Sequence, residues 1–248
     1  GVIADGGMAT SVSKIGVGTL VLSGTNTYTG TTTISDGTLR VENNSALGGT
    51  GTGTSVASPA TLELDNVAIG AEAVNIAGAG LGGNGALQGT GTASLSGVVT
   101  LDAAATIGGA GTLTLSGGVT DGASAFTLSV VGAGTQIFST AAVDVGAIDI
   151  NKTGGAANFT SNVTTTNNFT AQNGAYAVSL AGAANTIGGS GTFDNDSGVT
   201  IGASGGTSSF AGGLTTTGAT GTNTLNGTIS TTDQPITLGA VTLGSNTT

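Results

Sequence analysis

Two pairs of closely spaced carboxylates are the residues of this chain whose types and spacing are best suited to chemistry. Asp144 and Asp149 form one pair, and Asp194 and Asp196 form the other. Two carboxyl groups that flank a glycosidic bond can hydrolyse it, one as general acid and the other as base or nucleophile. These pairs are therefore the candidates for a carbohydrate-cleaving site.

Partners for such carboxylates are scarce. Only Tyr28 and Tyr176 could stack on a sugar ring, and neither adjoins a carboxylate pair. The chain has no His, Cys or Trp, which removes most acid–base, nucleophilic and thiolate–metal constellations. The sequence thus predicts no catalytic residue and no enzyme. A carbohydrate-binding or carbohydrate-cleaving β-helix is the alternative hypothesis.

Glycine-rich segments raise the question of calcium, because the repeat G-G-x-G-x-D-x-U-x binds this ion. Three segments begin in this way, and they start at Gly82, Gly108 and Gly188. Their sixth positions hold apolar residues in place of the ligating Asp, namely Leu87, Leu113 and Phe193. The run Asp194–Gly198 clusters oxygen atoms but lacks the remaining EF-hand ligands. We therefore expect neither a metal site nor a cofactor.

Threonines at strand spacing raise a third hypothesis, ice binding. They stand at Thr25, Thr27 and Thr29, and again at Thr220, Thr222 and Thr224. Ice binding would need a flat, regular threonine plane over many coils, whereas the clusters here are irregular. Threonine on the solvent face of a strand is the ordinary case.

The overall charge excludes several partners. Thirteen acidic residues face only Lys14, Arg40 and Lys152, giving a net charge of −10. Nucleic-acid binding draws on clustered Lys and Arg, so neither nucleic acids nor anionic membranes are expected partners. No apolar run approaches the roughly 18–20 residues of a membrane helix, so this chain is not expected to insert into a membrane.

Short motifs recur along the whole chain and indicate one repeating architecture. One family comprises Ile15–Ser23 and Val131–Ser139. A second comprises the segments starting at Leu47, Leu81, Ile107 and Ile187, and a third those starting at Ser96, Ser116 and Ser197. Glycine makes up 48 of 248 residues, and charged residues only 6%, so repetition has to supply the burial that large side chains supply elsewhere.

Apolar–x–apolar triads separate the glycine clusters, and this period of two is typical of strands with one buried face. The triads begin at Leu20, Leu39, Leu62, Val74, Val99, Leu113, Phe126, Ile148, Val178 and Val199. Their intervals lie near 20 residues or near half of that, as expected for coils that hold two or three short strands. The sequence predicts an all-β parallel β-solenoid of about 12 coils over residues 1–248, with an antiparallel sandwich as the competing fold.

Residues 16–48 resemble the autotransporter-associated β-strand repeat found in passenger regions of bacterial surface proteins. The resemblance rests on Gly18–Gly24, Asn26–Gly30, Thr32–Ile34, Gly37–Val41 and Ala46–Gly48, and Ser58–Asp65 looks like the strand that follows. It is strong over residues 16–66 and degenerate elsewhere. It implies a right-handed β-helix, export across the envelope to the cell surface, and roles in adhesion, aggregation or surface display, but no particular ligand. Cell-surface or glycan receptors are the partners expected for an adhesive role.

Neither end of the chain shows a pattern that would cap a solenoid. Pro235–Gly244 is still in strand pattern close to the C-terminus, and residues 1–14 show no cap. A terminal coil exposes unpaired backbone groups and apolar surface. We therefore expect a processed product or a piece of a longer protein, with either adjoining repeats or a second copy stacked head to tail.

Overall fold

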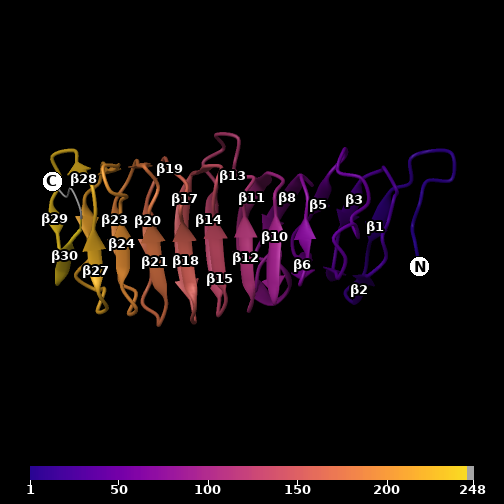
Figure 1. Cartoon of the computed structure of the whole chain (residues 1–248), viewed down its shortest axis with the longest axis horizontal. Helices are drawn as coiled ribbons and strands as arrows, with labels where there is room; N and C mark the ends of the chain where they lie inside the picture. Colours follow the sequence, from indigo (N-terminus) through magenta and orange to yellow (C-terminus); the bar gives the residue numbers. More distant parts are fainter. Residues whose placement is uncertain (245–248) are drawn as a thin grey trace.

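The chain winds into a single rod in which short strands run across the long axis (Figure 1). The computed structural model describes residues 1–244. All strand pairings of the described residues are parallel, and they form a β-solenoid of about 11 turns. This confirms the predicted solenoid and excludes the antiparallel sandwich.

Three rows of strands make up the walls of the rod, which we call faces 1, 2 and 3. Face 1 consists of β1 (Val12–Lys14), β3 (Thr32–Ile34), β5 (Thr54–Val56), β8 (Val74–Gly78), the first part of β11 (Val99–Gly108), β13 (Val119–Thr120), β16 (Val143–Val145), β19 (Val163–Thr165), β22 (Ala184–Ile187), β25 (Thr207–Phe210) and β28 (Thr228–Thr231).

Face 2 joins face 1 through β11, which is long enough to pair in both. It consists of β2 (Thr19–Leu22), β4 (Thr38–Val41), β6 (Thr61–Asp65), β9 (Leu87–Thr90), the second part of β11, β14 (Thr127–Gly132), β17 (Ala147–Lys152), β20 (Phe169–Ala171), β23 (Gly191–Phe193), β26 (Leu214–Thr215) and β29 (Ile236–Thr237).

Face 3 is a separate sheet of nine strands. It consists of β7 (Ala68–Ile69), β10 (Thr92–Leu95), β12 (Thr112–Leu115), β15 (Thr135–Phe138), β18 (Ala156–Phe159), β21 (Ala177–Leu180), β24 (Val199–Ile201), β27 (Asn223–Leu225) and β30 (Val241–Leu243). The only helical element among residues 1–244 is a short 3-10 turn, η1 (Leu81–Gly83).

Coil length explains why the rod has slightly fewer turns than the sequence spacing predicted. Register partners on face 1 are 20 residues apart where coils are tight, as for Val12 and Thr32, and 25 apart for Val74 and Val99. The longer coil contains η1. Another long coil carries a loop that starts at Asp121, whose carboxylate accepts backbone N–H groups at 2.7–3.0 Å.

Alternation of side chains along each short strand builds the interior. In most strands the apolar or β-branched residues point inward, and the residue between them points to solvent. Leu39, Leu62 and Leu87 lie in register on successive coils and are all fully buried. Stacking of like residues therefore replaces the closed core of an ordinary domain.

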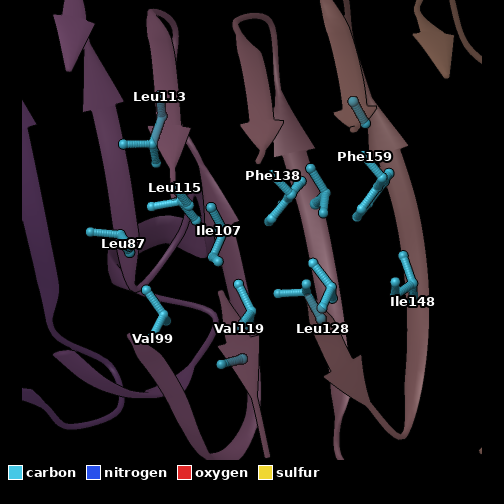
Figure 2. Close-up of a cluster of buried hydrophobic side chains, with 14 of the residues drawn as sticks. Leu87, Val99, Ile107, Leu113, Leu115, Val119, Leu128, Phe138, Ile148 and Phe159 are labelled. Atoms are coloured by element: carbon cyan, nitrogen blue, oxygen red, sulfur yellow. The ribbon is translucent and has the colours of Figure 1, made fainter. Parts of the chain in front are cut away.

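Phenylalanines fill the interior of the C-terminal half. Phe138 and Phe159 stack with ring centroids 4.5 Å apart, and Phe159 meets Phe169 edge to face at 5.5 Å. Phe193 and Phe210 continue the row. Figure 2 shows Phe138 and Phe159 beside the aliphatic side chains of the neighbouring coils. These rings supply the large buried area that the composition as a whole lacks.

Candidate functional site

The members of the first carboxylate pair lie on different faces of the rod, and one member of each pair accepts a side-chain hydrogen bond. Asp144 is exposed on face 1 in β16, whereas Asp149 lies on face 2 in β17 and accepts two hydrogen bonds from Gln172 Nε2, at 2.7 and 2.9 Å. Asp196 accepts a hydrogen bond from Thr220 Oγ1 at 3.1 Å. Hydrogen bonds between side chains of successive coils thus account for two of the carboxylates.

Neither tyrosine is available for stacking on a sugar. Tyr28 and Tyr176 are fully buried, and each uses its hydroxyl inside the rod. Tyr28 bonds Thr32 Oγ1 at 2.6 Å, and Tyr176 donates to the carbonyl oxygen of Ile150 at 2.8 Å. Burial raises the pKa of both phenols. The carbohydrate-cleaving hypothesis therefore loses its aromatic residues.

The glycine-rich segments that begin like calcium repeats supply core residues instead of ligands. Leu87, Leu113 and Phe193 occupy the position of the ligating Asp, and all three are fully buried. In residues 1–244 no three carboxylates come together as a metal cluster. The polar run near Asp194 belongs to the strand-to-strand corner that follows β23, where Asn195 donates to the carbonyl oxygens of Tyr176 and Gly198.

The threonine clusters do not form one plane. Thr25, Thr27 and Thr29 lie in the first coil, whereas Thr220, Thr222 and Thr224 lie in and before β27, close to the other end of the rod. Between them the outward column of face 3 changes character from coil to coil: it runs Ala68, Ser94, Thr114, Ile137, Asn158, Ser179, Thr200 and Thr224. An ice-matching surface would need an unbroken rank.

A column of short polar side chains runs along face 1 from one end to the other. Register places one member in each coil: Ser13, Thr33, Ser55, Asn75, Thr100, Thr120, Asp144, Thr164, Thr186, Ser209 and Ser230. None of these side chains is aromatic or basic. This wall is a continuous, weakly acidic, hydrophilic strip.

Each of the three basic side chains has partners in the chain, Lys14 and Lys152 inside the rod and Arg40 on its outside, where its side chain is 37% exposed. Lys14 is 5% exposed, and its Nζ donates to the carbonyl oxygens of Gly16 and Asp36 at 2.5 and 2.9 Å. Lys152 is 2% exposed, and Arg40 pairs with Asp65 and, at 3.2 Å, with Glu42. Among the described residues, no cationic side chain on the outer surface is left without a partner.

This arrangement predicts resistance to proteases. Trypsin can act only after Lys14, Arg40 and Lys152, and the backbone at all three lies in paired strands or beside them. We expect native digestion with trypsin or proteinase K to leave the chain intact, because ladder backbone opens rarely. Urea-denatured chain, as the control, should be cut after Arg40. Rapid cleavage of the native chain by proteinase K would contradict the prediction.

Comparison with known proteins finds a family match in the first coils of the rod. Residues 12–41 match the passenger-associated-transport-repeat. This confirms, for 30 of the 248 residues, the resemblance to an autotransporter passenger repeat, over a shorter span than the 16–66 expected from the sequence. A passenger repeat of this kind implies a secreted or surface protein. Searches of the curated proteins and of the solved structures gave no significant match.

The transport repeat corresponds to β1–β4, which means that it begins on face 1 and ends on face 2 one coil later. Its Lys14 ties two coils together through the carbonyl oxygen of Asp36. Strands β3 and β4 then pair in unbroken register with β5 and β6, outside the matched residues. In the part that the structure describes, no helix has the length and hydropathy to span a membrane.

A buried acid lies next to the transport repeat. Glu72 is 2% exposed, and its Oε1 accepts a hydrogen bond from Thr54 Oγ1 at 2.7 Å. Its Oε2 has no hydrogen-bond partner among the described residues. Burial raises the pKa of this carboxyl group above its ordinary value of 4.5. No sequence pattern marked this residue.

Because the pKa of Glu72 is raised, the free energy of unfolding should fall as the pH rises. The pKa of this carboxyl group is higher in the folded state than the value of about 4.5 in the unfolded state. The folded protein therefore loses stability as the pH rises from about 4.5 through the folded-state pKa, because the buried carboxyl group has to ionise. We therefore expect Glu72→Gln to be more stable than the wild type at pH 7, with a difference that shrinks towards pH 4. Chemical denaturation at both pH values measures this, with Asp144→Asn, whose side chain is exposed on face 1, as control. A difference independent of pH would contradict the prediction.

Proposed function

We propose that this chain is a rigid, non-catalytic segment of a secreted or surface-exposed rod with a structural or adhesive role. The observation that carries the proposal is the transport repeat at residues 12–41, which runs in register into a solenoid of about 11 turns. The hydrophilic column on face 1 and the absence of free cationic side chains support it. Such a wall suits a spacer or display surface better than a catalytic groove.

Surface labelling tests the location. Antibodies raised against the folded chain are expected to label intact cells of the producing organism or to detect the protein in the medium. Brief proteinase treatment of intact cells should then remove flanking regions before the solenoid. Labelling that appears only after cell lysis would contradict the proposal.

Adhesion needs a separate measurement. Beads coated with the folded chain are expected to bind to host cells or to one another, whereas beads coated with heat-unfolded chain serve as control. Equal binding of the two kinds of beads would mean that non-specific contacts cause the binding, and it would contradict the adhesive part of the proposal. The structural part would stand.

The proposal extends to assembly through the ends of the rod. Strands β28, β29 and β30 pair with the preceding coil along one edge, and no further strand of the described residues covers the other edge. Ile236 and Leu243 there are 43% and 65% exposed. At the opposite end Ile15 and Val17 are 75% and 77% exposed. A further coil of the same kind, from an adjoining repeat or a second copy, would cover such a surface, and a head-to-tail contact of this type propagates.

Charges placed at the open edge test this assembly. The isolated chain is expected to associate with rising concentration in light scattering, and the double variant Ile236→Lys/Leu243→Lys to remain monomeric, because Lys on an edge opposes pairing. The double variant Thr186→Lys/Ser209→Lys adds the same charge to the side wall of interior coils and should associate like the wild type. A monomeric wild type at high concentration would refute end-to-end stacking.

A further inference from the structure

A lysine and a glutamine meet inside the rod, and no charged group of residues 1–244 bonds to the lysine there. Lys152 is the last residue of β17 and is 2% exposed, and Gln136 lies in β15 on the preceding coil and is fully buried. The ammonium nitrogen of Lys152 contacts Gln136 Oε1. Its other partners are the carbonyl oxygens of Val131 and Gly132, at 3.4 and 3.3 Å.

Burying these two side chains lowers the free energy of unfolding. No carboxylate of the described residues is among the partners of Lys152, so a charge at Nζ has no counter-ion among them. Nε2 of Gln136 is buried and has no hydrogen-bond partner among the described residues. Burial also lowers the pKa of Lys152 to about 8, so a neutral amine is accessible at mildly alkaline pH.

The second buried lysine provides a comparison within the chain. Nζ of Lys14 is surrounded by main-chain carbonyl oxygens only, those of Ile15, Gly16 and Asp36. Peptide carbonyl groups in a continuous backbone cannot release a small leaving group. Lys152 differs because the atom it contacts belongs to a primary carboxamide, and the electrophilic Cδ lies one carbonyl bond, about 1.2 Å, from the contacted oxygen.

We propose that Lys152 and Gln136 become joined by an intramolecular isopeptide bond. The neutral Nζ attacks Cδ of Gln136, and the tetrahedral intermediate passes one proton from Nζ to Nε2. The Cδ–Nε2 bond then breaks and ammonia leaves, so that the product is a secondary amide between the two side chains. No oxidant, metal or further reactant is needed.

The fold supplies what this slow reaction requires. The two groups are buried and held in contact, and fixed proximity of this kind reaches effective molarities of about 10⁵–10⁸ M in well-oriented intramolecular reactions. The product removes the unpaired cation and the unpartnered NH₂ group together. It also connects β15 covalently to β17, and therefore one coil to the next across the interior.

Mass spectrometry of the whole folded chain, followed by peptide mapping, tests the proposal. The chain is expected to weigh less than its sequence by one ammonia. After denaturation trypsin should cut after Lys14 and Arg40 but not after the acylated Lys152, leaving residues 41–248 as one fragment. Fragmentation of that piece should place the bond between Lys152 and Gln136.

The variant Gln136→Met keeps the volume and removes the electrophile. It should retain the full mass of its own sequence and regain tryptic cleavage after Lys152. This also separates the isopeptide bond from ammonia loss at the three Asn–Gly sequences, Asn84–Gly85, Asn173–Gly174 and Asn226–Gly227. Wild-type chain of full mass that is cleaved after Lys152 would overturn the proposal. So would a mass loss that persists in Gln136→Met with Lys152 cleavable in both chains.

Discussion

Replacing Phe159 by alanine is expected to lower the free energy of unfolding by about 3–5 kcal/mol. Phe159 is fully buried and stacks on Phe138, which lies beside it in Figure 2. It also meets Phe169 edge to face. The alanine would leave a cavity in the middle of the ring row, and the ladders on all three faces limit how far neighbouring coils can close it.

Urea denaturation followed by circular dichroism measures this loss. Phe126→Ala is the matched control, because Phe126 only packs against the edge of the core. The Phe126→Ala substitution should lower the free energy of unfolding by about 1 kcal/mol, because Phe126 buries a smaller area. Equal losses for the two variants would mean that the ring row does not stabilise the rod.

The second large effect is expected from a glycine at a corner. Gly117 lies between β12 and β13, and a Cβ there would come within 2.2 Å of the carbonyl oxygen of Gly97 on the coil below. Its φ is not in the left-handed region, so the obstacle is purely steric. Because the contact is with backbone, Gly117→Ala should force the two coils apart and lower the free energy of unfolding by about 2–3 kcal/mol.

Gly70→Ala is the control for this substitution. Gly70 lies in the corresponding corner before β8, and a Cβ there would meet nothing within 4 Å. Its stability should stay within about 0.5 kcal/mol of the wild type. A thermal or urea midpoint that falls equally in both variants would show that coils do not approach one another as closely as the structure has them.

Period-two triads were sufficient to predict the fold class, because in a parallel solenoid every strand has one buried face. The triads at Leu39, Leu62 and Val74 all lie in strands with both apolar residues buried. Two triads differ: Leu20, in the first coil, is 38% exposed, and Phe126 does not lie in a strand. Phe126 has a local reason. It precedes β14, follows Ala125 with φ +56°, and is only partly buried.

The recurring glycine motifs mark corners but do not mark equivalent positions in the coil. Ile15–Ser23 turns the chain from face 1 to face 2, whereas Val131–Ser139 turns it from face 2 to face 3. Likewise, Ile107 lies on face 2 and Ile187 on face 1. The local chemistry of a tight corner is the same at each place, so sequence similarity alone does not give the register.

The interior polar groups and the phenylalanine row could not be read from the sequence. Phe138, Phe169 and Phe210 come from faces 3, 2 and 1, so their ring contacts have no fixed spacing along the chain. Lys152 follows the outward–inward alternation of β17 in an inward position, where a lysine is unexpected. Its partner Gln136 lies 16 residues away, and only the stacking of coils brings the two together.

Spin-label distances along face 1 test the central claim, the coil-by-coil parallel register, most directly. The chain has no Cys, so label pairs can be introduced without removing native thiols. Labels at Thr33 and, in turn, Thr120, Thr164 or Ser209 span four, six and eight coils in the observed register. At about 4.8 Å per coil, this register predicts distances near 19, 29 and 38 Å that grow linearly with coil number. Distances that do not increase in this order would contradict the solenoid and, with it, the proposal of a rigid surface rod.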